Sequence, residues 1–174
     1  LGQVIKENNG TPIMTKTGHS YIKSEISKSN AILGGEMSGH IFYNDNWYGF
    51  DDGIFAALKL LEILSSKEST THEVFNKFTQ LFNTPEIKIA VEDEEKFEIV
   101  EQLKVKLKPE GYDSILIDGL RLENKDCWGL VRASNTTPSL ILRFEANTEQ
   151  KLMEIQELFQ KTLLEINKNL KFLN

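Results

Sequence analysis

One seven-residue stretch, Arg132 to Pro138, combines residue types that suit anion binding. It reads Arg-Ala-Ser-Asn-Thr-Thr-Pro and offers one cation, three hydroxyls, one carboxamide and a row of backbone N–H groups. Arginine suits a phosphate because its planar guanidinium donates two parallel hydrogen bonds and keeps its charge near neutral pH. Successive backbone N–H groups in a turn can form a concave nest for the same anion. A polar hairpin turn would use the same residue types, so both interpretations stay open.

The glycine-rich stretch Gly34 to His40 is a second candidate site. Glycines let the backbone approach a ligand closely, and the carboxylate of Glu36 can accept hydrogen bonds from sugar hydroxyls. His40 could transfer a proton near neutral pH. A solvated glycine-rich turn is the alternative. A serine-hydrolase elbow is excluded, because Gly-x-Ser-x-Gly needs a glycine two residues before Ser38, where Glu36 stands.

Two further groups of polar residues lie near predicted helix starts. Lys16 and His19 precede a helical pattern, and a helix N-terminus attracts anions, so His19 could be an acid, a base, a ligand donor or a cap. Asp51 and Asp52 are predicted to cap the next helix rather than to bind a metal. Three scattered histidines and the single Cys127 predict no metal site.

In the first half of the chain, these candidates lie at the ends of predicted elements. A strand at Val4–Ile5, a helix over 21–30 and strands over 31–33 and 41–43 give an α/β pattern, in which ligands bind at loops beyond strand ends. A helix over 54–64 is apolar nearly all round, which predicts burial on more than one side, against a sheet and a missing neighbouring domain. A short helix is predicted over 72–81.

The pattern changes at Asn83-Thr84-Pro85, which we take as a domain boundary, with domains at 1–83 and 84–174. The second part predicts a strand, a helix, several strands and a closing helix. This order indicates an α+β layer with an antiparallel sheet covered by helices on one face. The predicted elements are a strand over 87–91, a helix over 97–107, strands over 115–117, 120–122, 128–131 and 140–142, and a helix over 152–166.

Bulk composition excludes several partner classes. The 174 residues carry a formal net charge of −6 and no basic run, so no nucleic-acid partner is expected. No apolar run approaches the length of a membrane span, so no membrane association is expected. A lone cysteine allows no intrachain disulfide and fits the cytoplasm best. Because residue 1 is Leu rather than Met, we expect a piece of a longer protein.

Four motifs in a fixed order resemble the α-D-phosphohexomutase superfamily, and most closely its bacterial phosphomannomutase/phosphoglucomutase members. The motifs are Lys16–Ser20, Gly35–His40, Gly49–Gly53 and Gly129–Pro138. Enzymes of this superfamily have four domains around one cleft. The resemblance implies that this chain is the later part of the third domain, with a mixed sheet, followed by a fourth domain of TATA-binding-protein-like fold.

The resemblance also implies roles for particular residues. Glu36 and Ser38 match the loop that grips the sugar hydroxyls, and Lys16 is expected to contact substrate. His19 and His40 match cleft histidines with roles in proton transfer or substrate contact. The residues implied to hold the non-reacting phosphate are Arg132, Ser134, Asn135, Thr136 and Thr137.

Two of the superfamily's motifs are absent from this sequence. No Ser-His-Asn-Pro-like phosphoserine run occurs, and no Asp-Gly-Asp-x-Asp-Arg loop for Mg²⁺. The resemblance implies that both lie in missing N-terminal domains of the parent enzyme, which would convert hexose 1- and 6-phosphates through a hexose 1,6-bisphosphate. We therefore expect no mutase activity from this chain alone, because the phosphoryl donor and the metal would be lacking.

Three other interpretations remain open. The chain could belong to a phosphoglucosamine mutase, whose sugar loop would be expected to differ around Met37–Ser38. It could be a non-catalytic module that binds sugar phosphates. It could also be a folded piece without measurable affinity, because half of a cleft offers fewer contacts to offset the cost of ordering a ligand.

Overall fold

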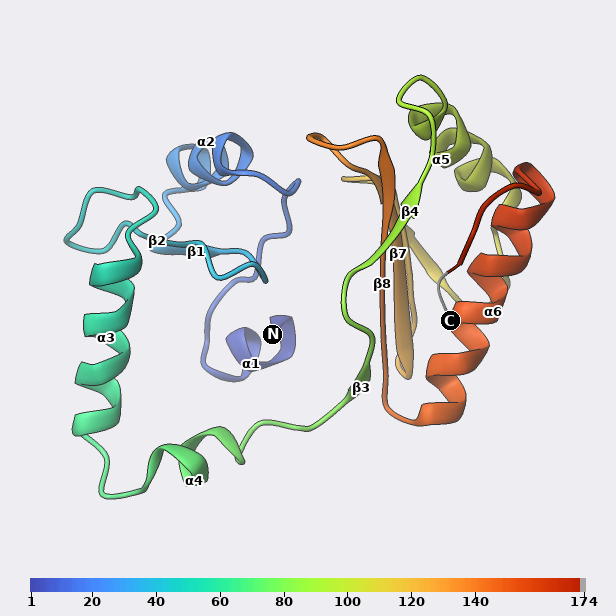
Figure 1. The fold of residues 1–174 in the computed structure, drawn as a ribbon. Coiled ribbons are helices and arrows are strands. Elements are labelled where there is room, and N and C mark those ends of the chain that lie inside the picture. The colour runs from blue at the N-terminus through green and yellow to red at the C-terminus, as the bar shows by residue number, and fades with distance from the viewer. Residues whose placement is uncertain (173–174) are drawn as a thin grey trace. The chain divides into compact units, whose positions relative to one another are not determined.

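The computed structural model describes residues 1–172, which fall into two compact units, residues 1–78 and residues 79–172 (Figure 1). In the first unit a two-stranded antiparallel sheet carries a helix on each side. Its elements are α1 (Gly2–Glu7), α2 (His19–Ser29), β1 (Leu33–Gly35), β2 (Ile41–Tyr43), α3 (Gly53–Ser65) and α4 (Thr71–Phe75).

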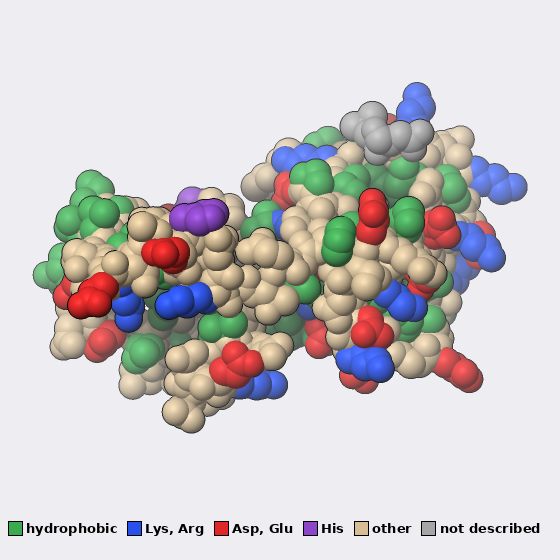
Figure 2. Space-filling model, turned by 90° about the horizontal axis from the view of Figure 1, so that it is seen from below, with side chains coloured by type: hydrophobic (Ala, Val, Ile, Leu, Met, Phe, Trp, Pro, Cys, Tyr) green, Lys and Arg blue, Asp and Glu red, His purple; other side chains and the backbone are tan. Residues whose placement is uncertain are grey.

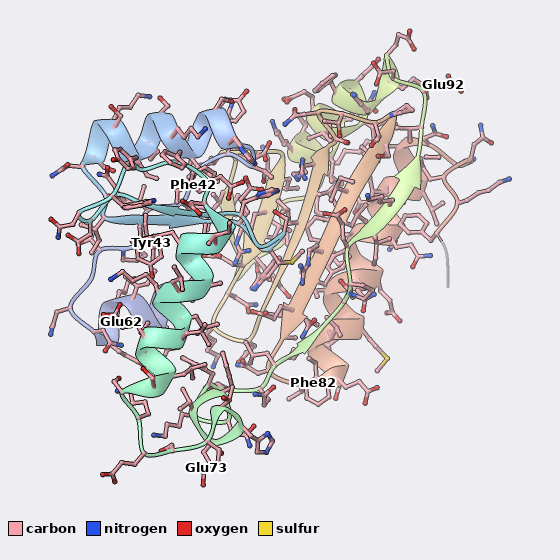
Figure 3. All side chains as sticks on the ribbon, turned by 60° about the vertical axis from the view of Figure 1, so that its left-hand side comes forward. Phe42, Tyr43, Glu62, Glu73, Phe82 and Glu92 are labelled. Carbon is pink, nitrogen blue, oxygen red and sulfur yellow. The ribbon has the colours of Figure 1, made fainter. Side chains whose placement is uncertain are left out.

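Adjacent residues of β2 hold the two helices through opposite faces of the strand. Phe42 is fully buried and packs with Ile22 and Ile26 of α2. Tyr43 points the other way, and its ring lies 5.5 Å from that of Phe55 in α3 (Figure 3). The alternation of side chains along a strand therefore decides that α2 and α3 pack on different faces of this hairpin.

Helix α3 forms where predicted. The burial expected for this helix on more than one side, in part against a missing neighbouring domain, is not present within the described residues. None of its residues is buried, and Ile54 is 79% exposed. Apolar side chains are visible at the surface of this unit, on the left in Figure 2. The described aromatic contacts of α3 are made through Phe55 alone, with Tyr43 of β2 and with Trp47, whose ring stacks on Phe55 at 4.1 Å. Two strands are too narrow to cover a helix that is apolar nearly all round.

Other local predictions for the first unit need correction. Val4–Ile5 lies in helix α1 rather than in a strand, because two apolar residues carry too little periodicity to distinguish the two. The strand predicted over 31–33 begins only at Leu33, and Ile32 is exposed. The helix predicted over 72–81 ends at Phe75.

The second unit is an antiparallel sheet whose central members are the two longest strands. Strand order is β3-β8-β7-β6-β5, and β4 also pairs with β8. Strand β3 pairs through Phe82 and Asn83, so these residues belong to the second unit's sheet. The elements are β3 (Phe82–Asn83), β4 (Ile87–Ala90), α5 (Glu95–Lys106), β5 (Asp113–Ile115), β6 (Leu120–Glu123), β7 (Cys127–Ala133), β8 (Ser139–Ala146) and α6 (Glu149–Ile166).

Helices α5 and α6 lie on the same face of this sheet (Figure 1). Strand β7 alternates strictly, with every second residue buried, and Phe159 of α6 packs edge-on against Phe144 of β8. Thr148 caps α6 by accepting from the Lys151 N–H at 3.2 Å. The predicted fold class, an α/β part followed by an antiparallel α+β domain, is confirmed. In the described chain no helix has both the length and the apolar character to span a bilayer.

The core of the second unit predicts a large effect for one aromatic residue. Phe159→Ala should lower the free energy of unfolding of this unit by about 3–5 kcal/mol, because it opens a cavity under β7 and β8. Phe97→Ala on α5 is the matched control, since Phe97 is largely exposed, and should cost only about 0.5 kcal/mol. Urea titration followed through the amide signals of β7 measures both. Equal losses would contradict the assignment of the core.

Candidate functional site

The Arg132–Pro138 stretch is the connection between β7 and β8. Ala133 pairs with Leu140, and the Ser134 N–H donates to the Ser139 carbonyl at 2.9 Å, so the ladder runs up to the base of the loop. The two strands are buried in the sheet centre, and they hold both ends of the loop rigidly.

Ser134 organises the turn from inside. Its side chain is buried, and its oxygen accepts from the N–H groups of Thr136 at 3.3 Å and Thr137 at 3.1 Å. The Thr137 hydroxyl also donates to it at 2.8 Å. The loop was predicted to offer a row of backbone N–H groups, and two of them, those of Thr136 and Thr137, donate within the turn. Ser134 and Thr137 therefore hold the loop's shape.

The donors that remain for an anion are at the exposed tip and at the end of β7. Asn135 and Thr136 are exposed. Arg132 is half-buried, and its one described hydrogen bond is a long one of 3.5 Å to the neighbouring Ala133 carbonyl. Of the residues implied to bind phosphate, Arg132, Asn135 and Thr136 have side chains placed to reach a ligand.

All three arginines of the chain share one face of the second sheet, opposite α5 and α6. Arg121 and Arg143 lie in one row with Leu130 between them, and Arg132 lies two residues from Leu130, beside Ile141. Arg132 and Arg143 are thus diagonal neighbours, within reach of long side chains. The sequence did not predict this grouping, because only the strand register brings the arginines together.

The three arginines differ in their partners. Arg121 donates to the Glu123 carboxylate at 2.7 Å and stacks on the Trp128 ring at 4.0 Å. Arg143 donates to the Thr84 carbonyl at 3.2 Å, and its buried Nε has no partner among the described residues. Within the described chain, neither Arg132 nor Arg143 pairs with a carboxylate, but Arg143 is tied to Thr84, whereas Arg132 has only its long contact with Ala133. Arg132, at the base of the loop, is therefore the arginine best placed to attract an anion.

Gly119 fixes the backbone beside Arg132. Its φ is +82°, in the left-handed region that favours glycine, within the Asp118–Gly119 turn. A Cβ at this position would meet the Val131 carbonyl oxygen and would lie 2.7 Å from the Arg132 Cα. Glycine is required here both for the turn and for the close approach of the two strands.

In the first unit, the structure brings together three residues that the sequence left apart. The His40 Nδ1 lies 2.7 Å from the Asp51 Oδ2, and the His19 Nε2 lies 3.6 Å from the same oxygen. The Ile41 N–H donates to the other Asp51 oxygen at 3.2 Å. The Asp51-Asp52-Gly53 stretch was predicted to cap a helix. Asp52 makes this cap by accepting from the Phe55 N–H at 2.9 Å, and Asp51 does not take part in it.

The surroundings of Asp51 favour its charged form. Partial burial opposes ionisation, but the hydrogen bond and charge of His40, the Ile41 N–H and the charge of His19 together lower the pKa of Asp51 below 3.8. With Asp51 ionised, the shared proton sits on the His40 Nδ1, which leaves its Nε2 as the proton-accepting atom. A histidine oriented by a carboxylate in this way can act as a general acid or base.

The neighbouring glycine-rich loop presents a carboxylate with one unused oxygen. The Glu36 N–H donates to the His40 carbonyl at 2.9 Å, and the Ser38 hydroxyl donates to Glu36 Oε2 at 3.3 Å. Glu36 Oε1 is buried and has no partner among the described residues. A buried acceptor without a donor is costly, so this oxygen is suited to a ligand hydroxyl.

His19, His40 and Asp51 could also hold a metal ion. Their ligand atoms all lie within 4.8 Å of one another, and nitrogen with carboxylate oxygen suits a transition metal such as Zn²⁺. The histidines are therefore not scattered as the sequence indicated, although His72 lies elsewhere and contacts Asn76. The 2.7 Å contact of His40 with Asp51 satisfies both groups without a metal.

Lys16 is exposed, with its ammonium 5.5 Å from the centre of the Tyr21 ring. No described contact ties it to Asp51 or Glu36. Sequence reasoning missed Asp51 as a site residue. The available signal was the pair of adjacent aspartates, because a helix needs only one N-cap.

The close approach at Gly119 predicts a stability loss beyond that of its backbone angle. Gly119→Ala should cost about 1–2 kcal/mol for the left-handed backbone and a further amount of about 1–3 kcal/mol for the clash with Val131 and Arg132. Gly111→Ala is the control, because Gly111 has a φ of +80° but open space around a Cβ. Urea unfolding should show the larger loss at Gly119, and equal losses would rule out the clash.

The His40–Asp51 contact predicts a titration shift. The carboxyl carbon signal of Asp51 should titrate with a midpoint below 3.8, and His40→Ala should raise that midpoint. Because the folded pKa is lowered, the stabilisation is present above the unfolded pKa and is lost as the pH falls through the folded value, in the window below about pH 4. His72→Ala should leave the midpoint unchanged. A wild-type midpoint at or above 3.8 would refute the contact.

Comparison with known proteins gives the same family for both units. The model of phosphoglucomutase/phosphomannomutase α/β/α domain III matches residues 1–82, and the model of the C-terminal domain of that family matches residues 86–161. The division of the chain at 83/84 into these two domains stays a prediction.

Curated relatives and a solved structure agree with the family models. A phosphomannomutase/phosphoglucomutase of Pseudomonas syringae is 49% identical over 95% of this chain and 36% of its own length. A phosphoglucomutase of Neisseria meningitidis is 49% identical over 98% of this chain and 37% of its own length. A probable phosphoglucosamine mutase of Thermococcus gammatolerans is 32% identical over 95% of this chain and 36% of its own length.

A crystal structure of a phosphoglucomutase/phosphomannomutase family protein from Burkholderia thailandensis matches 98% of this chain and 36% of that one, with 37% identity and a TM-score of 0.89. The chain thus spans little more than a third of the length of these relatives. Both family models and the shared fold lead to one conclusion, that the chain belongs to the phosphoglucomutase/phosphomannomutase family.

Proposed function

We propose that this chain is the C-terminal part of a phosphohexomutase that interconverts the 1- and 6-phosphates of glucose and mannose through a hexose 1,6-bisphosphate. In this proposal the Arg132–Thr137 loop holds the non-reacting phosphate, and the Gly34–His40 loop holds the sugar hydroxyls. The chain supplies recognition, whereas the phosphoserine and the metal belong to the rest of the enzyme. The substrate class is supported by the names of the two bacterial relatives that are 49% identical to this chain.

The state of Arg132 carries the proposal. Its one described hydrogen bond is the long contact with Ala133, no carboxylate pairs with it in the described chain, and it lies at the base of a loop whose exposed tip adds the Asn135 carboxamide and the Thr136 hydroxyl. A phosphate can take two parallel hydrogen bonds from the guanidinium. Ser134, inside the turn, keeps these donors in a fixed arrangement, which lowers the cost of binding.

The sugar side of the proposal rests on Glu36. Its buried Oε1 lacks a donor, and a sugar hydroxyl would supply one. Hydroxyls that glucose and mannose share would satisfy this carboxylate equally well, which fits an enzyme that accepts both sugars.

His40 has a defined part in the proposed reaction. When a sugar hydroxyl attacks a phosphoryl group, its proton must be accepted, and in the reverse direction it must be returned. With Asp51 holding the proton on Nδ1, the His40 Nε2 can accept and return the hydroxyl proton. Asp51 orients the ring and stabilises the imidazolium, as a carboxylate does for any histidine base.

The Mg²⁺ that the family implies does not fit the acidic residues near this site. Mg²⁺ prefers oxygen ligands in octahedral geometry. Asp51 already accepts from His40 and Ile41, and Asp52 from the Phe55 N–H and the Trp47 indole. We therefore derive no step through the metal, and we propose that this chain alone gives no turnover.

Ligand titration of this chain tests the proposal. Inorganic phosphate should shift the amide signals of residues 132–137, and glucose 1-phosphate and mannose 1-phosphate should also shift those of 34–40. Arg132→Gln should weaken phosphate binding about tenfold or more, because it removes a charge-assisted bidentate contact. Arg121→Gln is the matched control, since it removes the same charge from the same face and should change affinity by less than about twofold.

Each contrary result has a separate meaning. Equal losses from Arg121→Gln and Arg132→Gln would show a general charge effect instead of a binding site. Shifts at 132–137 without shifts at 34–40 would remove the sugar-binding part of the proposal. No shifts at millimolar ligand would remove the claim that this chain binds substrate by itself.

A further inference from the structure

Lys96, in the first turn of α5, is a buried lysine whose side chain reaches the Arg132–Thr137 loop. The residue is only 4% exposed, and its ammonium donates to the Thr137 carbonyl at 3.3 Å, across 41 residues of sequence. It also donates to the Asp93 carboxylate at 2.6 Å. Nothing in the sequence distinguishes Lys96 from the other charged residues around it.

The burial of the Lys96 ammonium is energetically unfavourable by itself and therefore needs an explanation. Taking a charged group out of water is costly unless its hydrogen bonds are replaced. Asp93 offers only partial compensation, because its own side chain is 66% exposed. An ammonium has three donors, and the described chain gives this one two hydrogen-bond partners, Asp93 and Thr137. A lysine used only to solubilise a helix would extend into solvent instead.

Lys96 acts together with a second contact on the same side of the loop. The Val91 N–H donates to the Pro138 carbonyl at 3.1 Å. The segment from Val91 to Lys96 therefore holds two successive carbonyls of the loop, while Ser134 holds the loop from inside. These contacts restrain the Thr137–Pro138 end of the loop on both sides.

We propose that Lys96 is a positioning residue for phosphate binding, an inference that rests on the proposed function of the Arg132–Thr137 loop. By holding the Thr137 carbonyl, it fixes the turn that presents Asn135 and Thr136. Its ammonium also places a positive charge beside the returning end of the loop, in a chain whose net charge is negative. Because the Lys96 side chain is itself buried, this charge is held in one place, whereas the ammonium of a surface lysine moves freely in solvent.

Two substitutions on α5 separate this role from a general loss of charge. Lys96→Met removes the ammonium and keeps an unbranched side chain suited to a buried position. Lys104→Met is the matched control, because Lys104 is also paired with a carboxylate three residues earlier on the same helix, at 2.6 Å from Glu101. Both variants lose one positive charge, and the described contacts tie only Lys96 to the loop.

The test has a readout without ligand and one with it. In the free protein, Lys96→Met should shift the amide signals of residues 134–139 and of Val91, whereas Lys104→Met should not. The dissociation constant for inorganic phosphate, read from the 132–137 amides, should rise about twofold to tenfold for Lys96→Met, the range that corresponds to the loss of one ordinary hydrogen bond, because Lys96 holds the loop and does not itself donate to the phosphate. Lys96→Arg, which keeps the charge, should recover most of that loss.

Asp93→Asn decides whether Lys96 acts through the loop or through the start of α5. It removes the charge of the exposed Asp93 side chain and leaves the contact between Lys96 and Thr137, so phosphate binding should be unchanged or tighter. Weakening by Asp93→Asn equal to that by Lys96→Met would overturn the proposal. An unchanged loop spectrum and unchanged phosphate affinity in Lys96→Met would overturn it as well.

A measurement on the unsubstituted chain tests the proposal even if the variants do not fold. A buried, hydrogen-bonded ammonium exchanges its protons slowly, so the Lys96 Nζ signal should be visible and should shift when phosphate is added, while that of Lys104 should not. If phosphate shifts the loop amides and leaves the Lys96 Nζ signal unmoved, the proposal for Lys96 is overturned, and the proposed function of the loop is not affected. If phosphate moves no loop amide in the unsubstituted chain, the claim that this chain binds phosphate by itself fails, and the free-protein spectra still decide whether Lys96 holds the loop.

Discussion

The pairing of β7 with β8 is the constraint on which the second unit depends. Seven residue pairs join these strands, and every other strand of the sheet is attached to one of them directly or through β6. The pleat sends Val131 and Ala133 into the core and leaves Arg132 between them on the opposite face. A one-residue slip would bury the arginine and expose the valine, so the hydrophobic core itself fixes the direction of the guanidinium.

The few cations near the loop differ in their partners, and therefore in how available they are to an anion. The chain is acidic, and its three arginines stand on one sheet face. Arg121 is compensated by Glu123 and Trp128, and Arg143 is held by the Thr84 carbonyl, which leaves Arg132 available. Lys96 adds a buried charge on the other side of the loop. An acidic protein can thus bind an anion through local arrangement of charge instead of through its net charge.

The first unit has a different balance of forces. Its core is small, built on Ile22, Ile26 and Phe42, and the long apolar helix α3 has no buried residue in the described structure. The hairpin β1–β2 nevertheless places His40 and Asp51 together, because Phe42 and Asp51 form an isolated bridge beside it. The polar pair is therefore set by backbone contacts that do not need a large core.

The sequence by itself determined most helices and strands of the second unit, since apolar periods of 2 and 3.6 residues reflect which side chains face a core that the unit contains. It also determined the family, because four motifs in order carry that information locally, and the family models confirmed it. It could not determine the exposure of α3, the pairing of Asp51 with His40, the grouping of the arginines or the reach of Lys96 to Thr137. Each of these depends on strand register or on contacts between distant segments, and such contacts leave no periodic pattern in the chain. Only the tertiary structure decided them, because the free energy of a polar contact depends on which partners and how much water the fold leaves around it.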